Sequence, residues 1–347
     1  MKIAQVAPLA ESVPPRLYGG TERVVSYLTE ELVRLGHDVT LFASADSQTA
    51  ARLVACAPRA LRLDPEVTDA LPHHLLMIER ARSRAQEFDV LHFHVEHVHL
   101  PLFRPFAHKC VTTLHGRLDL PDLVPLYREF REMPLVSVSN SQRGPLAGAN
   151  WAGTVHHGLP DAVCPYNPAP RGNYLAFLGR ISPEKGVEHA IDIARRAGQR
   201  LCIAAKIDQV DEAYWHSRVK PLISGPIEYV GEVSERDKPS FLGNASALLF
   251  PIDWPEPFGL VMIEAMSCGT PVIAWPRGSV PEIVDHGVTG FIAGTVEEGV
   301  AAVGAAARLD RALVRRRFEE RFSATRMALD YLALYRRLGA KKTELVP

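Results

Sequence analysis

The stretch PIDWPEPFGLVMIEAMSCGTPVIAW, residues 251–275, runs from the end of one predicted strand through a helix and into the next strand. Residues 247–252, ALLFPI, form a short apolar run that predicts a strand, and PVIAW, residues 271–275, forms another. Between them, a proline-rich loop carries Glu256 and Gly259 and leads into the helical stretch LVMIEAMS. Strands that alternate with helices are typical of parallel sheets, so this stretch predicts an α/β fold.

The same alternation continues in both directions along the 347 residues of the chain. Most predicted strands are nearly continuous apolar runs, as expected for parallel strands that are covered on both faces. The first half of the chain contains predicted strands at 2–8, 37–44, 89–94, 110–115, 135–141 and 154–158. The second half contains predicted strands at 173–180, 200–206, 227–233, 247–252, 271–275 and 289–294.

A proline-rich stretch separates the two arrays. Residues 159–172, LPDAVCPYNPAPRG, hold four prolines and read as a linker. We therefore expect two Rossmann-like, doubly wound parallel-sheet domains, at 1–158 and 173–322, that face a cleft. The last helical stretch covers about 310–338, and we expect its second part, about 323–338, to pack back on the first domain.

Composition excludes several classes of protein. The formal net charge of −1 gives no electrostatic argument for binding nucleic acid. The five cysteines are scattered and never form a CxxC pair, which favours reduced thiols over disulfides or a zinc site. The amino-terminal stretch is too broken for a signal peptide, and no apolar run reaches the roughly 20 residues that span a bilayer. We expect a cytoplasmic protein and leave open weak peripheral contact with a membrane.

The segment LGRISPEKG, residues 178–186, predicts an anion site where a strand passes into a helix. Ser182 is a good N-cap residue and Pro183 suits the first helical position. Lys185 then lies in the first turn, where the helix dipole disfavours a cation. A phosphate held by Arg180, Lys185 and free backbone N–H groups would resolve this conflict. The alternative is an ordinary helix start with two solvated cations.

The loop that carries Glu256 points to a ligand with hydroxyl groups. Gly259 allows close approach of the backbone just before the helix begins. Glu264 lies about one turn inside that helix among apolar residues, and a buried carboxylate needs a partner. A pair of ligand hydroxyls would supply one, as would a neighbouring arginine.

The chain resembles the retaining glycosyltransferases of the GT-B architecture, family 4, also called glycosyl transferases group 1. Glu256 and Glu264, followed by CGTPVI, are similar to the family's E-x7-E signature and its G-x-P-V tail. Further matching motifs occur in the family's order along nearly the full chain: GGTE at 19–22, TLHG at 113–116, RISPEKG at 180–186 and GSVPEIV at 278–284.

The resemblance implies roles for individual residues. Arg180 and Lys185 would grip the donor diphosphate, and Glu264 would bind the ribose hydroxyls. His115 would reach the donor sugar, and Glu256 would hold sugar hydroxyls or take part in the chemistry. The remaining donor-binding residues that the resemblance implies are Gly19, Gly20, Val233, Phe258, Gly259, Leu260 and Val261.

The implied reaction moves a sugar from a nucleotide-diphosphate sugar to a carbohydrate or lipid-linked acceptor, with retention of configuration. Cations beside a helix start would stabilise the departing nucleotide, so no metal or other cofactor is required. UDP-glucose is the donor expected from family frequency. One departure is Lys206-Ile207-Asp208, which stands where the family often has a glycine-rich turn and leaves the nucleotide base unassigned.

Two strand ends are predicted to face the acceptor. His92 and His94 share one face of a strand in LHFHVEHVHLP, and Ser139 and Asn140 end another strand. The clustered histidines also suggest a zinc site, but no cysteine or HExxH pattern supports one. Ordinary helix capping is an equal alternative for Ser139 and Asn140.

Other functions remain as alternatives. A sugar-nucleotide epimerase can share this two-domain architecture, and a non-catalytic protein that binds sugar nucleotides is a third class. A nicotinamide-dependent dehydrogenase is disfavoured, because APLAESVPPRLYGG, and no G-x-G-x-x-G motif, follows the first strand.

Overall fold

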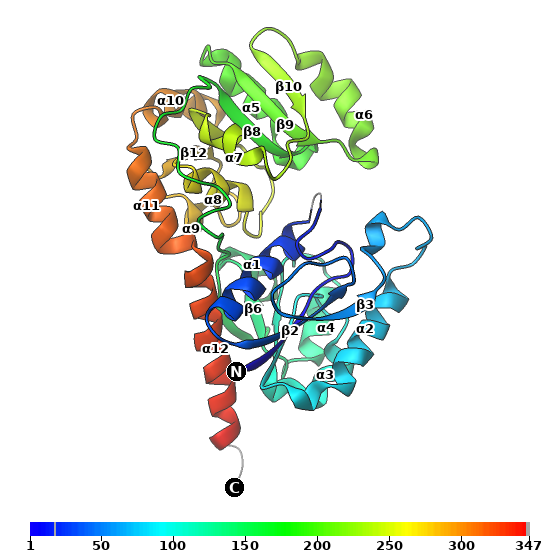
Figure 1. The fold of residues 1–347 in the computed structure, drawn as a ribbon. Coiled ribbons are helices and arrows are strands. Elements are labelled where there is room, and N and C mark those ends of the chain that lie inside the picture. Colours follow the sequence, from blue (N-terminus) through cyan, green and yellow to red (C-terminus); the bar gives the residue numbers. More distant parts are fainter. Residues whose placement is uncertain (17–18, 345–347) are drawn as a thin grey trace. The chain divides into compact units, whose positions relative to one another are not determined.

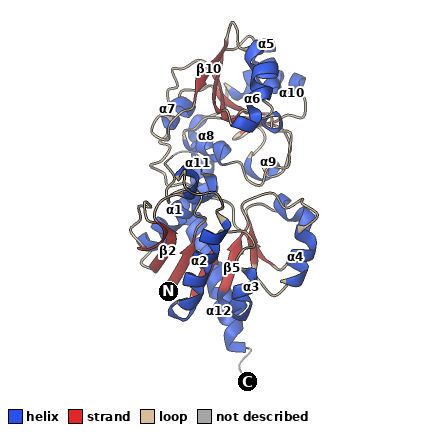
Figure 2. Ribbon diagram, turned by 90° about the vertical axis from the view of Figure 1, so that its right-hand side faces the viewer, coloured by secondary structure: helices blue, strands red, loops and turns tan. Residues whose placement is uncertain are grey.

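The computed structural model describes residues 1–16 and 19–344, without the side chains of 340–344, and it divides into two compact units (Figure 1). Unit 1 comprises Met1–Gly158 and Ala324–Pro347, and unit 2 comprises Leu159–Ser323. Each unit is an α/β structure in which helices flank the strands on both sides (Figure 2). No helix within the described residues is both long enough and apolar enough to cross a membrane.

Unit 1 is built on a seven-stranded parallel sheet with the order β3-β2-β1-β4-β5-β6-β7. Its strands are β1 (Lys2–Val6), β2 (Asp38–Ser44), β3 (Arg52–Ala57), β4 (Val90–Phe93), β5 (Cys110–Thr113), β6 (Leu135–Ser137) and β7 (Trp151–Thr154). Its α-helices are α1 (Gly20–Arg34), α2 (Leu71–Ser83), α3 (Leu100–Phe103), α4 (Leu123–Glu129) and α12 (Ala324–Glu344).

The sheet of unit 1 has an apolar core on each face. Phe42, Phe93 and Met77 belong to the larger core, which α2 and α3 cover. Val25 of α1 packs with Leu41 on the other face. Helix α12 packs beside α1, so residues from the two ends of the chain share one unit.

Unit 2 is built on a six-stranded parallel sheet with the order β10-β9-β8-β11-β12-β13. Its strands are β8 (Leu175–Arg180), β9 (Leu201–Lys206), β10 (Ile227–Gly231), β11 (Ala247–Phe250), β12 (Val272–Ala274) and β13 (Gly290–Ile292). Its α-helices are α5 (Val187–Arg196), α6 (Glu212–Tyr214), α7 (Lys238–Gly243), α8 (Leu260–Ser267), α9 (Val280–Ile283), α10 (Val296–Ala306) and α11 (Arg311–Phe322).

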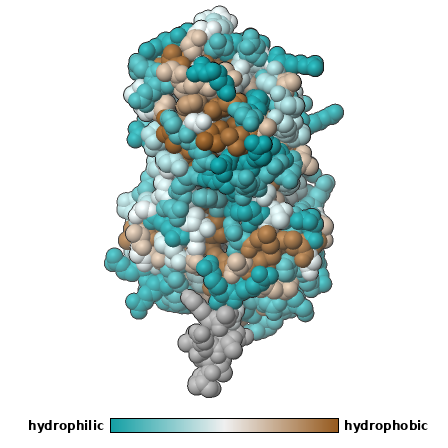
Figure 3. Space-filling model, turned by 90° about the vertical axis from the view of Figure 1, so that its left-hand side faces the viewer, coloured by the Kyte–Doolittle hydropathy of each residue, from teal (hydrophilic) through white to brown (hydrophobic). Residues whose placement is uncertain are grey.

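The packing of unit 2 follows from its sequence pattern. The strands are mostly apolar, and β9, β11 and β12 are almost wholly buried, since α5 and α10 pack together on one face while α8 and α11 pack together on the other. The view in Figure 3 shows a largely hydrophilic surface on which hydrophobic side chains gather in a patch on each unit.

Most predicted strands are found, but one strand was missed and two predictions need correction. Strand β3 was not predicted, although five of its six residues, RLVACA, are apolar; it lies at the edge of the sheet, where its side chains are only partly buried. The strand predicted at 154–158 lies instead at Trp151–Thr154, where its register is set by pairing with β6. The single helical stretch at 310–338 is two helices, since Ser323 has an extended backbone between α11 and α12.

Candidate functional site

The strand order of unit 2 reverses between β8 and β11, and ligands of open parallel sheets bind outside the carboxyl ends of strands at such a point. Arg180 is the last residue of β8, and Lys185 is the last residue of the 3-10 turn that follows this strand. Glu256 lies in the loop between β11 and α8. The sequence therefore delivers the predicted cations and the predicted carboxylate to the same edge of the sheet.

Lys185 and Glu256 are in direct contact at this edge. Lys185 Nζ lies 2.6 Å from Glu256 Oε2, and the side chains are only 19% and 14% exposed. Trp254 Nε1 donates a second hydrogen bond to the same carboxylate oxygen at 2.9 Å. The ammonium group also lies 5.5 Å from the centroid of the Trp254 ring. The loop after β11 thus holds its carboxylate in a fixed position beside the lysine.

The backbone between Arg180 and α5 differs from the predicted helix start. Pro183–Lys185 forms a 3-10 turn preceded by Ser182, and α5 begins only at Val187. Gly186 separates the two with φ of +71°, and a Cβ atom there would lie 1.9 Å from the carbonyl oxygen of Pro251. Only glycine lets the turn that carries Lys185 approach the loop after β11 this closely.

Arg180 is surrounded by carboxylates that the motif did not predict. Its guanidinium group lies 2.6 Å from Glu184, 3.5 Å from Asp211 and 3.7 Å from Asp208. Burial lowers the pKa of Arg180, but these neighbouring charges outweigh burial and raise it above its ordinary value. Lys206 also pairs with Asp208 at 2.8 Å, so the unusual Lys206-Ile207-Asp208 segment belongs to this charged network.

The motif GSVPE braces the loop that carries Glu256. The backbone N–H of Ser279 donates to Glu256 O at 3.0 Å, and its hydroxyl donates to Phe258 O at 2.7 Å. Gly278 has a φ of +56°, and a Cβ atom there would lie 2.3 Å from Glu256 O. Two motifs about twenty residues apart therefore form one structure.

Helix α8 begins directly after this loop. Gly259 precedes its first residue with φ of +79°, and Phe258 is buried with 3% exposure. Leu260 and Val261, which the resemblance assigns to donor binding, are half-buried in the first turn. Backbone N–H groups in the first turn of a helix lack helical partners, which makes this turn suitable for an anion.

Glu264 is buried with 4% exposure, and its partner is a lysine. Lys238 Nζ lies 2.8 Å from Glu264 Oε1 and 2.7 Å from Glu235 Oε1. Burial lowers the pKa of Lys238, but the charges of Glu264 and Glu235 outweigh it and raise the pKa above its ordinary value. Sequence reasoning missed Lys238, although its spacing of four from the buried Leu242 places both on one helix face.

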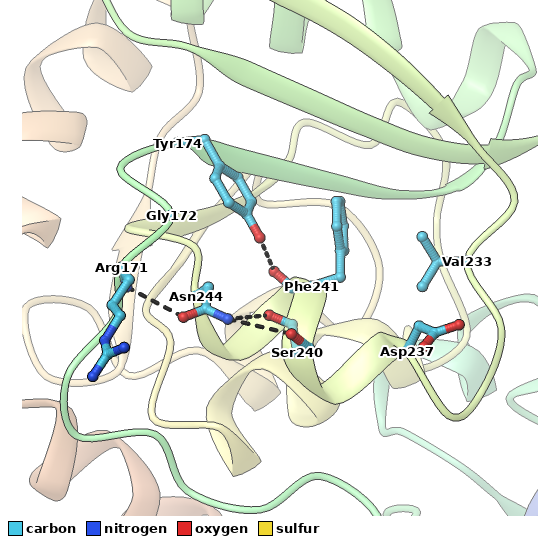
Figure 4. Close-up of a pocket in the computed structure, with 8 residues that line it drawn as sticks. All are labelled: Arg171, Gly172, Tyr174, Val233, Asp237, Ser240, Phe241 and Asn244. Atoms are coloured by element: carbon cyan, nitrogen blue, oxygen red, sulfur yellow. Dashed lines mark hydrogen bonds between the residues drawn. The ribbon is translucent and has the colours of Figure 1, made fainter.

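Val233 follows β10 and lines a shallow hollow beside α7 (Figure 4). The hollow contains Tyr174, whose hydroxyl donates to Phe241 O at 2.6 Å. Its full lining is Arg171, Gly172, Tyr174, Val233, Asp237, Ser240, Phe241 and Asn244. Val233 alone among the predicted donor residues belongs to it, so the hollow is separate from the Lys185–Glu256 contact.

Gly19 and Gly20 lie where the first loop of unit 1 meets α1. Gly20 begins the helix and is exposed, whereas Gly19 is buried. A Cβ atom on Gly19 would lie 2.9 Å from Pro15 Cβ and 3.1 Å from Glu22 Oε2. Only a residue without a side chain fits between these groups.

His115 follows β5 and is held through its backbone and its ring. Its backbone N–H donates to Glu96 Oε1 at 3.1 Å, and its Nε2 lies 2.9 Å from His94 Nδ1. The His115 ring also stacks on His157, with centroids 5.3 Å apart. Burial lowers the pKa of His115 to about 3, so its imidazole is neutral near pH 7. The sequence analysis did not predict that Glu96 would hold the backbone of His115 in place.

The predicted acceptor-side residues lie close to β4 and β6. His92 and His94 are 0% and 1% exposed, and both ring nitrogens of each are hydrogen-bonded within the protein. This arrangement favours a structural role for His92 and His94 within unit 1 over direct contact with an acceptor. Ser139 is buried and its hydroxyl accepts from the backbone of Gln142, whereas Asn140 is exposed and accepts from Thr154. Within the described part of the chain, no group of three or more His, Cys, Asp or Glu residues is arranged to hold a metal ion.

Comparison with known families matches both halves of the chain. The family described as "Glycosyl transferases group 1" matches residues 165–324, and "Glycosyltransferase Family 4" matches residues 18–166. A glycogen synthase of Mycobacterium tuberculosis is 27% identical, and the alignment covers 93% of this chain and 93% of that protein.

Solved structures with the same fold include two whose full length is matched. AviGT4, a glycosyltransferase involved in avilamycin A biosynthesis, is 27% identical with a TM-score of 0.76, and 98% of each chain is covered. HepE of Anabaena in complex with UDP-glucose is 18% identical with a TM-score of 0.69, and the match covers 99% of this chain and 100% of that one.

Proposed function

The chain belongs to the glycosyl transferases of group 1, and from this premise we propose that it is a retaining enzyme that moves glucose from UDP-glucose to a carbohydrate or lipid-linked acceptor. The family membership makes it a glycosyltransferase that uses a nucleotide sugar. The finer proposal concerns the donor, the stereochemistry and the independence from metal. UDP-glucose is proposed because HepE, which shares the fold, binds it.

The contact between Lys185 and Glu256 carries this proposal. It places a cation and a carboxylate 2.6 Å apart where the strand order reverses, beside the first turn of α8. A nucleotide sugar needs this combination, because its diphosphate is an anion and its sugar presents hydroxyl donors. We assign the diphosphate to Lys185, Arg180 and the first turn of α8, and the sugar hydroxyls to Glu256.

The proposed chemistry follows from charge development. As the bond between the sugar and the phosphate breaks, negative charge grows on the leaving UDP and positive charge grows on the anomeric carbon. Cations held in advance near the phosphate stabilise the leaving group without reorganisation, a type of contribution that is worth about 3–4 kcal/mol for one well-placed donor. Because Lys185 and Arg180 supply this charge, the reaction is proposed to proceed without a metal.

Other residues are assigned to binding. Oε1 of Glu264 is taken by Lys238, which leaves Oε2 as the acceptor for the ribose hydroxyls. Phe258, Gly259, Leu260 and Val261 bring the backbone of the loop and of α8 to the sugar and phosphate. In unit 1, His115 is assigned to a hydroxyl of the donor sugar, and Gly19 and Gly20 to a close approach of the backbone.

The test is a donor panel assayed by release of nucleoside diphosphate. The full chain is incubated with UDP-, ADP- and GDP-sugars, with and without glucose, maltose and a short glucan, in the presence of EDTA. We expect release of UDP from UDP-glucose that increases with an acceptor, and a product with the α configuration by proton NMR. Lys185→Ala should lower the rate of release by about 10²-fold or more, whereas Lys220→Ala, an exposed lysine of the same unit, should not.

Three outcomes would contradict parts of the proposal. Isomerisation of the donor sugar without release of UDP would identify an epimerase. Activity that EDTA removes and Mg²⁺ restores would contradict the independence from metal. Preference for ADP- or GDP-glucose would change the donor while leaving the assignment of the diphosphate in place.

A further inference from the structure

A continuous chain of side-chain hydrogen bonds runs from His115 into the interior of unit 1. His115 Nε2 lies 2.9 Å from His94 Nδ1, and His94 Nε2 lies 2.8 Å from Gln5 Oε1. The amide nitrogen of Gln5 donates to the hydroxyl of Tyr335 at 3.3 Å. Gln5, His94 and Tyr335 are each at most 1% exposed, so no water competes with these bonds.

The chain continues beyond Tyr335 between the sheet and α12. The Tyr335 hydroxyl lies 2.7 Å from His92 Nδ1, and His92 Nε2 lies 2.7 Å from Thr113 Oγ1. Thr113 Oγ1 lies 2.8 Å from the hydroxyl of Tyr331, where the chain ends. Strands β1, β4 and β5 and helix α12 each contribute to it.

The histidines of this chain are neutral near pH 7. Burial lowers the pKa of His92 and His94 well below the ordinary value, and the neighbouring histidines lower it further. Burial lowers the pKa of His115 to about 3. A neutral imidazole carries one N–H donor and one bare nitrogen acceptor. The direction of each hydrogen bond therefore determines the direction of the next one.

Gln5 sets that direction, since its amide has a distinct donor end and a distinct acceptor end. Because Gln5 Oε1 can only accept, His94 Nε2 must carry the proton and His94 Nδ1 must be bare. A bare His94 Nδ1 requires His115 Nε2 to carry the proton, which leaves His115 Nδ1 as an acceptor. Within the described residues, no group is hydrogen-bonded to His115 Nδ1.

We propose that Gln5 and His94 are positioning residues that hold His115 in its Nε2–H tautomer and present the lone pair of Nδ1 to a hydroxyl of the donor sugar. This inference rests on the proposed function, which assigns His115 to the donor sugar. The protein should therefore discriminate between a hydroxyl and a fluorine at one position of the sugar. An unprotonated ring nitrogen accepts a hydrogen bond from a hydroxyl group, whereas a fluorine atom has no hydrogen to donate. Between Gln5 and His115, reversing one hydrogen bond requires reversing the other and turning over the Gln5 amide, so the tautomer of His115 is fixed together with that of His94.

The tautomer can be read without substrate. Long-range ¹⁵N–¹H correlation spectra of the full chain, labelled with ¹⁵N-histidine, distinguish a protonated ring nitrogen from a bare one. The signals of His115 are assigned by their loss in His115→Gln. We expect a protonated Nε2 and a bare Nδ1 in the wild-type protein. A protonated Nδ1 would overturn the proposal irrespective of any activity.

Variants then test the link between the chain and the sugar. His94→Phe keeps the ring but removes both hydrogen bonds, and Gln5→Leu removes the acceptor that orients His94. His94→Asn retains an acceptor near the position of Nδ1 and serves as the conservative variant. Tyr331→Phe alters the far end of the chain and serves as the matched control.

The functional measurement is kcat/KM with UDP-glucose and with UDP-glucose analogues that carry fluorine in place of one hydroxyl at a time. In the wild-type protein, kcat/KM should be about tenfold lower for one analogue than for UDP-glucose, which corresponds to the loss of one hydrogen bond. His94→Phe and Gln5→Leu should lose this discrimination and show mixed tautomers, whereas His94→Asn and Tyr331→Phe should retain both properties. Unchanged tautomer and unchanged discrimination in His94→Phe would overturn the assignment. If none of the donors is turned over while the spectra show the expected tautomer, the failure lies with the proposed function.

Discussion

Lys185 Nζ lies 2.6 Å from Glu256 Oε2, which joins the turn after β8 to the loop after β11 in unit 2. These two segments leave neighbouring strands at the point where the strand order reverses. The contact is made by residues 71 positions apart in the sequence, and both side chains are mostly buried. It defines the candidate site of unit 2.

Replacing Lys185 by alanine should remove activity while leaving the fold in place. We expect a decrease in turnover of about 10²-fold or more, because a positioned cation at a leaving group has an effect of this order. Stability should fall by about 1–3 kcal/mol, because Glu256 loses its lysine in a mostly buried position but keeps the hydrogen bond from Trp254. Nucleotide release and urea unfolding measure the two effects. Activity close to that of Lys220→Ala would contradict the role of Lys185.

Gly186→Ala should destabilise unit 2 more than Gly198→Ala. Both glycines have positive φ, +71° and +64°, so alanine costs about 1–2 kcal/mol of backbone strain at either position. A Cβ atom at Gly198 meets nothing within 4 Å, whereas one at Gly186 would lie 1.9 Å from Pro251 O. The difference in unfolding free energy between the variants therefore reports the packing of the Lys185 turn against the loop after β11. Equal losses would show that this packing is not required.

Lys238→Met should be strongly destabilising, because it leaves Glu264 buried without a partner. The side chains of Lys238 and Glu264 are 10% and 5% exposed, and breaking a buried pair typically costs about 3–5 kcal/mol. Adding Glu264→Leu should recover most of the loss, since the buried charge is then absent. The control is Arg200→Met, whose partner Glu228 is 44% exposed and whose loss should cost at most about 1 kcal/mol. A double variant no more stable than Lys238→Met would contradict a charge-based cause.

The sequence predicted the part of the site that is encoded locally. Arg180, Lys185 and Glu256 each lie within a few residues of a strand end, and parallel topology brings such ends to one edge of the sheet. The buried strands were recognisable because each is an apolar run. The edge strand β3 was missed although its sequence, RLVACA, is also an apolar run; its side chains are only partly buried.

The partners of the site residues could not be predicted, because tertiary structure brings them together. Lys238 reaches Glu264 from another helix, and Asp208 and Asp211 reach Arg180 from the segment after β9. The series of hydrogen-bonded side chains in unit 1 was equally hidden in the sequence, since its members Gln5 and Tyr335 are separated by 330 positions. The pattern that was visible, two histidines on one face of a strand, did not reveal which helix covers that face.

Acid should destabilise unit 1 through its buried histidines. The five histidines concerned all have a pKa lowered chiefly by burial: His92, His94, His99, His115 and His157. In the unfolded chain they take up protons below about pH 6.5, while in the folded state they remain neutral to lower pH. The unfolded state thus binds more protons, and the stability that is present above pH 6.5 is lost as the pH falls toward 3.

Each of these histidines should contribute a slope of about 1.4 kcal/mol per pH unit, so acid unfolding is expected well above the ordinary pKa of carboxylates. The measurement is urea unfolding followed by circular dichroism between pH 7.5 and 5. His99 provides the clearest variant, because its pKa is lowered to about 3. It also lies outside the series of hydrogen-bonded side chains that ends at His115. His99→Gln should reduce the slope by one such contribution, whereas His216→Gln, at an exposed position of unit 2, should leave it unchanged. A slope that is the same in both variants would mean that burial of His99 does not couple folding to protonation.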